Sequence, residues 1–119
     1  MSHGALLRNV SDDPELASHV MHDYRNADLD PVTRAMLDFA TKLTREPAAM
    51  EESDVIALRD HGLTDEQILS VVLITCTFNF MTRLADGLGV EVPAEHQSEV
   101  ETWLTSPAKD QPWLMKAKG

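Results

Sequence analysis

Apolar residues recur with the spacing of α-helices along most of this sequence. The pattern is most pronounced over residues 67–91, where the chain is apolar around most of a helical circumference. A helix of this kind is typical of the middle of a helical core. No stretch of useful length alternates between polar and apolar residues, as a half-buried strand would. The sequence therefore predicts an all-α fold with the 67–91 helix at its centre.

Two proline-containing motifs mark the starts of helices. Asp13-Pro14 and Asp30-Pro31 each place a capping carboxylate before a proline at the first helical position. The helix that opens at Pro31 should end at Glu46, because the residue before Pro47 disfavours the helical region. One helix is therefore expected after each motif.

Glycines and a second kind of cap bound the remaining helices. Gly62 is a candidate left-handed cap of a shorter helix. Thr64 and Gln67 have the Thr-x-x-Gln spacing of a capping box at the head of the long helix. Gly87 and Gly89 are expected to end that helix.

The chain is short enough for one core, since it has 119 residues and a mass of 13.2 kDa. We expect a helical domain over residues 1–92. Residues 93–119 should form a weaker amphipathic helix, over about 93–104, and a tail.

The charge of the chain narrows its possible partners. A formal net charge of -10 argues against a nucleic-acid groove and against docking on anionic membranes. The run Val71–Ile74 is too short to span a bilayer, and no basic leader with an apolar region opens the chain. A cytoplasmic protein is expected. The single cysteine excludes an internal disulfide and a cysteine-rich zinc site.

Several short segments follow one another in an order that carries a family resemblance. Together they cover most of residues 3–91. They are His3-Gly4-Ala5-Leu6-Leu7-Arg8, Tyr24-Arg25 with Ala27-Asp28-Leu29, Leu37-Asp38-Phe39-Ala40 with Lys42-Leu43-Thr44-Arg45, Gly62-Leu63-Thr64-Asp65, and the ending from Phe78 to Glu91. In this order and spacing they resemble the peroxidase-related branch of the AhpD-like, carboxymuconolactone decarboxylase superfamily. The resemblance implies an AhpD-like helical bundle.

The resemblance also implies a particular chemistry. In that family two cysteines, separated by two residues, precede a histidine that lies four positions after the second cysteine, and a glutamate lies upstream. His3 matches this histidine and is the one catalytic position that carries over. A thiolate would attack the peroxide, the second thiol would form a disulfide, and an external dithiol would reduce it. Histidine suits the proton relay, because its pKa lies near neutrality.

The cysteine pair and the glutamate would fall before Met1. We therefore expect an N-terminally truncated bundle, completed by homo-oligomerisation, in which the redox pair is missing. Peroxide and a dithiol reductant are the implied partners of a full-length alkylhydroperoxidase-like form, with no cofactor. Two alternatives stay open: a decarboxylase-like enzyme, which needs no Cys-x-x-Cys pair, and a non-catalytic helical module for oligomerisation or binding.

The polar residues of the long helix, together with its cysteine, allow structural interpretations. Cys76 has apolar neighbours and is interpreted as a small core residue with a poorly nucleophilic thiol. A polar stripe either lines a cleft or forms a buried network that ties helices or subunits together, and we favour the network. The stripe consists of Thr75, Asn79, Thr82, Arg83 and Asp86.

The histidines do not predict a metal site. His19 and His22 share a helix face but lack a convincing third ligand. His61 and His96 are interpreted as surface residues. The acidic run 51–54 is expected to favour the start of a helix through the macrodipole.

Overall fold

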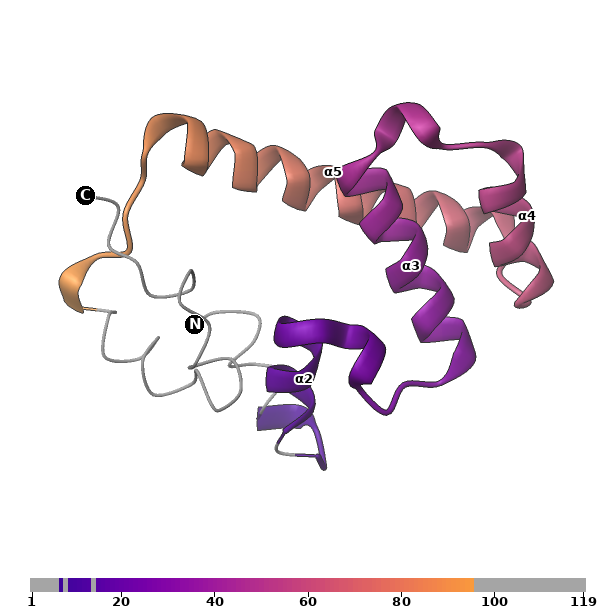
Figure 1. Ribbon diagram of the computed structural model, residues 1–119, viewed down its shortest axis with the longest axis horizontal. Coiled ribbons are helices and arrows are strands. Elements are labelled where there is room, and N and C mark those ends of the chain that lie inside the picture. Colours follow the sequence, from indigo (N-terminus) through magenta and orange to yellow (C-terminus); the bar gives the residue numbers. More distant parts are fainter. Residues whose placement is uncertain (1–6, 8, 14, 96–119) are drawn as a thin grey trace. The chain divides into compact units, whose positions relative to one another are not determined.

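The computed structural model describes residue 7, residues 9–13 and residues 15–95 of the chain (Figure 1). Helices and no strands occur within these residues, so the predicted all-α class is confirmed. The chain divides into two compact units, one of residues 1–28 and 91–119 and the other of residues 29–90. The elements are α2 (Leu16–Asp23), η1 (Tyr24–Asn26), α3 (Pro31–Arg45), η2 (Pro47–Ala49), α4 (Glu52–Asp60) and α5 (Asp65–Leu88).

In the first unit, α2 leads directly into the short helix η1. The carboxylate of Asp13 accepts a hydrogen bond from the backbone N–H of Glu15 at 2.9 Å, just before α2 begins. Asp23 caps η1 by accepting from the backbone N–H of Arg25 at 3.1 Å. Asp13 therefore bonds within the turn before α2, whereas the N-cap of the helix is Glu15 and has no side-chain cap bond, so the predicted capping role of Asp13 is wrong. Pro14 lies outside the described residues.

The second unit begins with α3, whose ends lie where the sequence predicts them. Asp30 accepts from the backbone N–H of Thr33 at 2.9 Å and from its hydroxyl at 2.6 Å. These bonds lower the pKa of the Asp30 carboxyl. Pro31 occupies the first turn, and the helix ends at Arg45. A capping carboxylate and two prolines therefore determine the length of α3.

The turn between α4 and α5 and the start of α5 also follow the predicted caps. Gly62 has a left-handed φ of 89°. The Thr64 N–H donates to Gln67 Oε1 at 2.9 Å, and the Gln67 N–H donates to Thr64 Oγ1 at 3.2 Å. This reciprocal pair of bonds is the predicted capping box.

The far end of α5 differs from the expectation at one glycine. Gly89 has a left-handed φ of 66° and ends the helix. The N–H of Val90 bonds to the Ala85 carbonyl at 2.9 Å and so closes the last turn. Gly87 was expected to help end the helix, but it lies inside it. One left-handed residue is sufficient to satisfy the last carbonyls.

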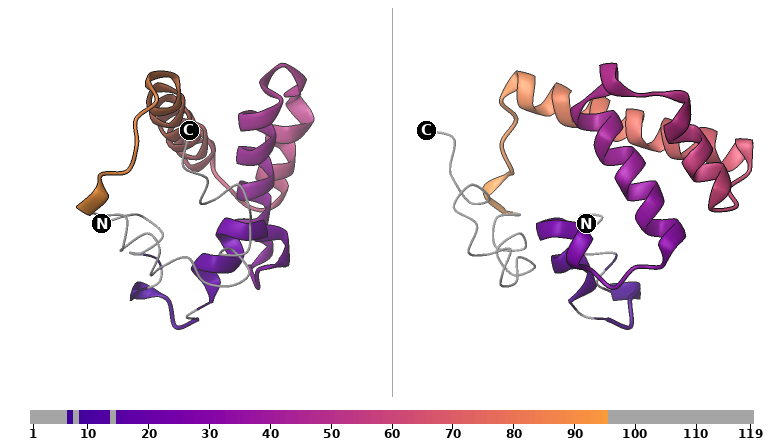
Figure 2. Two further views of the ribbon diagram at one scale, coloured as in Figure 1. Left: turned by 60° about the vertical axis from the view of Figure 1, so that its left-hand side comes forward. Right: turned by 45° about the vertical axis from the view of Figure 1, so that its right-hand side comes forward.

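The core of the second unit lies where α3, α4 and α5 meet. α3 crosses α5, and α4 contacts both (Figures 1 and 2). The buried cluster takes one residue from each helix and one from the turn before α5. These residues are Phe39, Leu58, Leu63 and Ile68. A small apolar cluster thus joins three helices.

An ion pair fastens α3 to the start of α4. Lys42 Nζ lies 2.7 and 2.8 Å from the two carboxylate oxygens of Asp54. The same carboxylate accepts from the backbone N–H of Glu51 at 2.8 Å. The bonds from Lys42 and Glu51 hold the pKa of the Asp54 carboxyl below its ordinary value of 3.8. The bond to Asp54 raises the pKa of Lys42 above 10.5.

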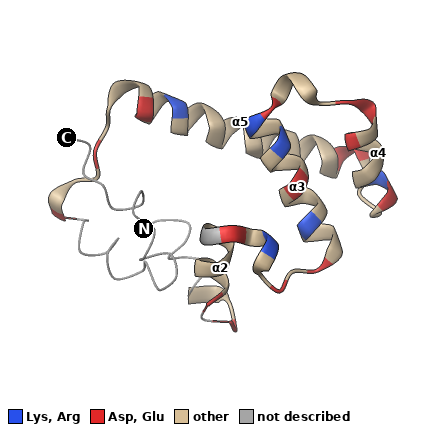
Figure 3. Cartoon of the chain, in the orientation of Figure 1, with Lys and Arg blue, Asp and Glu red and all other residues tan. Residues whose placement is uncertain are grey.

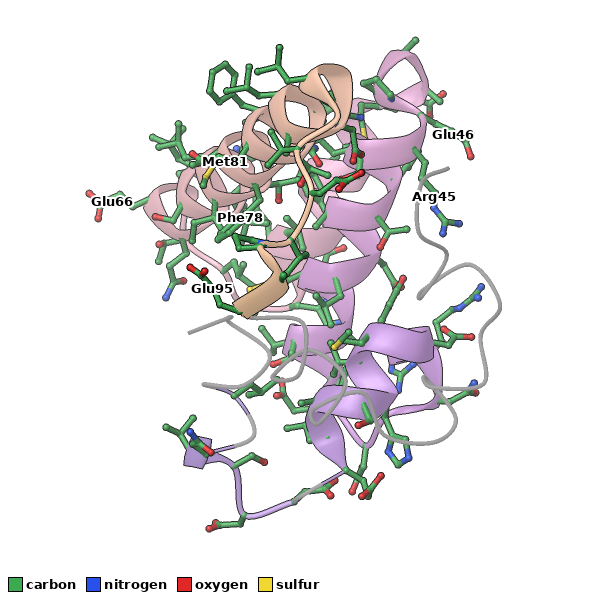
Figure 4. All side chains as sticks on the ribbon, turned by 90° about the vertical axis from the view of Figure 1, so that its left-hand side faces the viewer. Arg45, Glu46, Glu66, Phe78, Met81 and Glu95 are labelled. Atoms are coloured by element: carbon green, nitrogen blue, oxygen red, sulfur yellow. The ribbon has the colours of Figure 1, made fainter. Side chains whose placement is uncertain are left out.

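The long helix α5 is mostly exposed, so the expectation that it lies in the middle of the core is wrong for this chain. Ile68 is its one buried residue. α3 and α4 cover a single side of α5, because two helices cannot surround a helix that is apolar on most sides. The side chains of Phe78 and Met81 are among those that α3 and α4 leave exposed (Figure 4).

Removing the buried leucine of α4 should destabilise the second unit. Leu58 is 1% exposed, whereas Ile56, on the same helix, is 43% exposed. Leu58→Ala should lower the free energy of unfolding by about 2–5 kcal/mol, because it leaves a cavity among three helices. Ile56→Ala should change it by about 0.5 kcal/mol or less. Urea unfolding followed by circular dichroism measures both; equal losses would contradict this core.

The ion pair between α3 and α4 should make stability depend on pH in a defined way. The contribution of Asp54 is full above its unfolded pKa and disappears as the pH falls through the lowered folded value. The contribution of Lys42 is full below its unfolded pKa and disappears as the pH rises through the raised folded value. The ion pair should therefore stabilise the folded state fully at any pH between the unfolded pKa of Asp54 and the unfolded pKa of Lys42.

Asp54→Asn tests this dependence, since it removes the charge and keeps the acceptor. Unfolding free energies of the variant and the parent should differ most near about pH 7 and converge towards about pH 2. The matched control is Glu52→Gln, an exposed carboxylate in the same turn. A difference between Asp54→Asn and the parent that stayed constant with pH would contradict the ion-pair explanation.

Candidate functional site

His3, the one catalytic residue that the resemblance carries over, lies outside the described residues. The same holds for His96 and for most of the expected helix over 93–104, of which Ala94 and Glu95 are described and helical. The candidate site is therefore built from the polar and reactive side chains of the second unit.

A polar junction joins the end of α3 to the middle of α5. The Thr44 hydroxyl donates to the carbonyl of Ala40 at 2.7 Å. Asn79 Nδ2, on α5, donates to Thr44 Oγ1 at 3.1 Å. Both side chains are partly buried. The amide of Asn79 is thus held against the last turn of α3.

Arg83 completes this junction from the next turn of α5. Its Nη2 donates to the backbone carbonyl of Thr44 at 3.0 Å, and its Nη1 lies 3.5 Å from the carbonyl of Asn79. A guanidinium at the last turn of α3 donates to a carbonyl that has no partner in the helix, and its positive charge interacts favourably with the negative end of the helix dipole. The junction is the set Thr44, Asn79 and Arg83.

The junction confirms the interpretation of the polar stripe as a network between helices, for two of its residues. Asn79 and Arg83 bond to α3 as described above. Thr75 and Thr82 instead donate, each at 2.7 Å, to carbonyls one turn earlier in α5. Asp86 is exposed near the end of the helix. Thr75 and Thr82 therefore take no part in the contact with α3.

Cys76 is exposed, so its assignment to the core is wrong. Its apolar neighbours along the sequence belong to sides of α5 that α3 and α4 do not cover. No second cysteine exists in the sequence to pair with it. A thiol–disulfide cycle would therefore need a second thiol from outside these 119 residues.

The histidines with described side chains carry no constellation of catalytic groups. His61 is exposed, as predicted, and its Nδ1 lies 2.8 Å from the Ala57 carbonyl. His19 lies on α2 in the first unit. Within residues 7, 9–13 and 15–95 no group of three or more His, Cys, Asp or Glu could hold a metal ion.

Most of the exposed large apolar side chains among the described residues lie on α5. Residues 67–82 contain no Asp, Glu, Lys or Arg, and Figure 3 shows this uncharged stretch between the ends of the helix. We call its exposed large side chains the α5 apolar surface. They are Leu69, Leu73, Ile74, Phe78, Phe80, Met81, Leu84 and Leu88. A continuous surface of this kind marks an interaction site in a folded protein.

By length and composition, α5 could also cross a membrane. It has 24 residues, and an 18-residue window within it has a mean hydropathy of 1.6. The short run Val71–Ile74 therefore underestimated the apolar length of this helix. Core helices of soluble proteins have the same properties, so the finding is weak evidence for a membrane.

Two solved structures share this fold and much of this sequence. The first is an uncharacterized peroxidase-related protein from Silicibacter sp. TM1040, with 42% identity and a TM-score of 0.72. The second is an alkylhydroperoxidase AhpD core, an uncharacterized peroxidase-related protein from Ralstonia eutropha JMP134, with 40% identity and a TM-score of 0.69. Each match covers 78% of this chain and 49% of the other.

The chain thus spans about half the length of the solved relatives that it matches. No protein-family model and no curated protein matches the sequence. The similarity therefore rests on the two solved structures, at an identity well above the level at which only the fold is shared.

The junction of Thr44 and Asn79 should behave as a coupled pair. Asn79→Ala should lower the free energy of unfolding by about 1–2 kcal/mol, because a partly buried bond between two helices is lost. In a double-mutant cycle with Thr44→Val, the coupling should be about 0.5–1 kcal/mol. Additive losses would contradict the junction.

Thr77→Val is the matched control for this cycle. The Thr77 hydroxyl is exposed and donates to the Leu73 carbonyl of its own helix at 2.7 Å. Its removal should change the unfolding free energy by about 0.5 kcal/mol or less.

Proposed function

Over the part that it shares with the two solved structures, the chain belongs to the peroxidase-related branch of the AhpD-like family, and we propose that its helices are the scaffold of a thiol-dependent peroxide reductase. The observation that carries this proposal is the 42% identity with a peroxidase-related protein over 78% of the chain. The junction of α3 and α5 supports a structural role for the described helices, since its polar groups bond to one another.

The proposed reaction needs two thiols and a proton relay. A cysteine thiolate attacks one peroxide oxygen, the O–O bond breaks, and an alcohol or water leaves once it is protonated. The second cysteine attacks the resulting sulfenic acid, which forms the disulfide and releases water, and an external dithiol restores both thiols. His3 is the proposed proton relay, on the strength of its match to the family histidine.

The 119 residues alone lack the means for this cycle. They contain one cysteine, and that cysteine lies on α5 rather than four positions before His3. Peroxide reduction is therefore proposed for a protein in which a Cys-x-x-Cys pair is joined to His3. Its partners would be a peroxide and a dithiol, and a cytoplasmic location stays a prediction.

A non-catalytic binding or oligomerisation module is the second candidate for the 119-residue chain. The observation that favours it is the α5 apolar surface, which holds most of the exposed large apolar side chains in the described part of the chain. The described residues offer less support for decarboxylase chemistry. The Asp54 carboxylate bonds to Lys42, and the ring of His61 lies beside a backbone carbonyl at the surface.

Peroxide consumption with dithiothreitol as reductant tests the proposed function. The 119-residue chain should consume peroxide no faster than dithiothreitol alone. A fusion that places a segment with a Cys-x-x-Cys pair before this chain, in register with His3, should consume it catalytically. His3→Gln in that fusion should lower the rate by about 100-fold or more, because a proton relay is lost.

Cys76→Ser in the same fusion is the control and should leave the rate unchanged. A folded fusion without activity, or activity of the 119-residue chain that Cys76→Ser abolishes, would contradict the proposal. The intact mass and thiol count of the protein from its source cells would then show which form is natural.

A further inference from the structure

We propose that α5 pairs with α5 of a second copy of this chain, in antiparallel orientation, through a stripe of its apolar surface. This inference does not depend on the peroxidase proposal. The stripe consists of Leu69, Leu73, Phe80 and Leu84. All four side chains are more than half exposed, with values of 57, 57, 68 and 51%.

The four residues lie on one side of α5. Their spacings of four, seven and four residues keep them within one narrow sector of a helix with 3.6 residues per turn. The residues of α5 that face the rest of the second unit are others: Ile68 is buried, while Val71, Val72 and Asn79 are partly buried. The stripe is therefore not used by the fold of the second unit.

The spacing of the stripe is symmetric about the middle of the helix. α5 runs from Asp65 to Leu88, so its midpoint falls between Cys76 and Thr77. Leu73 and Phe80 lie equally far from this midpoint, and so do Leu69 and Leu84. A twofold axis at the midpoint would place Leu73 against Phe80 of the second copy, and Leu69 against Leu84. A twofold interface requires such self-complementarity.

Charge favours the antiparallel orientation over the parallel one. Asp65 and Glu66 begin α5, and Arg59 pairs with Asp65 at 3.0 Å. This end is therefore left with a net negative charge, whereas Arg83 and Asp86 near the other end compensate each other. A parallel pair would bring two acidic ends together in a chain whose net charge is already -10. An antiparallel pair sets each acidic end beside an end that contains Arg83, and it also opposes the helix dipoles.

Cys76 provides a direct test, because it is the one cysteine of the chain and lies next to the proposed twofold axis. Helices packed together have axes about 8–10 Å apart. A short bismaleimide should therefore link two copies through Cys76. Sedimentation equilibrium should give twice the chain mass of 13.2 kDa.

Two variants locate the interface. Phe80→Glu should weaken the dimer at least about 30-fold, the size of a hot-spot substitution. It should leave the helix content unchanged, because Phe80 is exposed in the second unit. Ile56→Glu, at an exposed apolar residue of α4, is the matched control and should leave the dimer intact.

The orientation is tested by moving the thiol. In a Cys76→Ser background, Glu66→Cys should not link to itself, because an antiparallel pair holds the two copies of that position about 30 Å apart along the axis. Efficient linking at this position would indicate a parallel pair and overturn the proposal.

Three further outcomes would also overturn it. A chain that stays monomeric at about 100 µM, far above the Kd of a typical specific interface, has no self-association surface. If the chain is a monomer and Phe80→Glu strongly lowers its melting temperature, residues of the same chain cover the stripe. If the chain binds to neutral phosphatidylcholine vesicles and Phe80→Glu abolishes this binding, lipid is the partner of the stripe.

Discussion

The contact of Leu58 with its neighbours in α3 and α5 is the interaction on which the second unit depends. α4 has only nine residues, and a helix of that length is not stable alone. Its place is fixed by burying Leu58 beside Phe39 and Ile68. Without Leu58, one side of the crossing between α3 and α5 would be open to water. The apolar cluster is small, so each of its members carries a large share of the stability.

Polar contacts then fix how the helices lie around this cluster. The bonds of Lys42 to Asp54 determine where α4 starts relative to α3. The bonds of Asn79 and Arg83 to Thr44 hold the middle of α5 at the end of α3. Apolar packing is nondirectional, whereas these bonds have defined geometry. The combination explains why Asn79 and Arg83, of all the polar residues of α5, bond to α3.

The helix ends were predictable from sequence because each of them depends on residues close together in the chain. Asp30 with Pro31, Thr64 with Gln67, and Gly62 all cap as their spacing indicates. Gly87 shows the limit of that reasoning, since a glycine ends a helix only where the backbone turns left-handed. The family was likewise predictable, from the order of short segments, and the two solved structures bear it out.

Burial was not predictable, because it depends on what other helices cover. The apolar sequence around Cys76 is compatible with a core residue, and the structure leaves that residue exposed. Assignment to the core from apolar sequence neighbours would be equally wrong for other residues on the sides of α5 that α3 and α4 leave uncovered. The polar network could be anticipated only as one of two interpretations, since the partner, Thr44, lies 35 positions from Asn79.

The exposed surface of α5 links the fold to both proposals. The solved relatives are about twice as long as their match to this chain. In a protein of that length, further helices could cover the sides of α5 that α3 and α4 leave open. In the 119-residue chain the same sides have no cover within the second unit, and the hydrophobic effect favours any arrangement that removes them from water. A second copy satisfies this constraint with residues already present, because the stripe is complementary to itself. The proposed peroxidase scaffold and the proposed association surface are then two consequences of one long apolar helix.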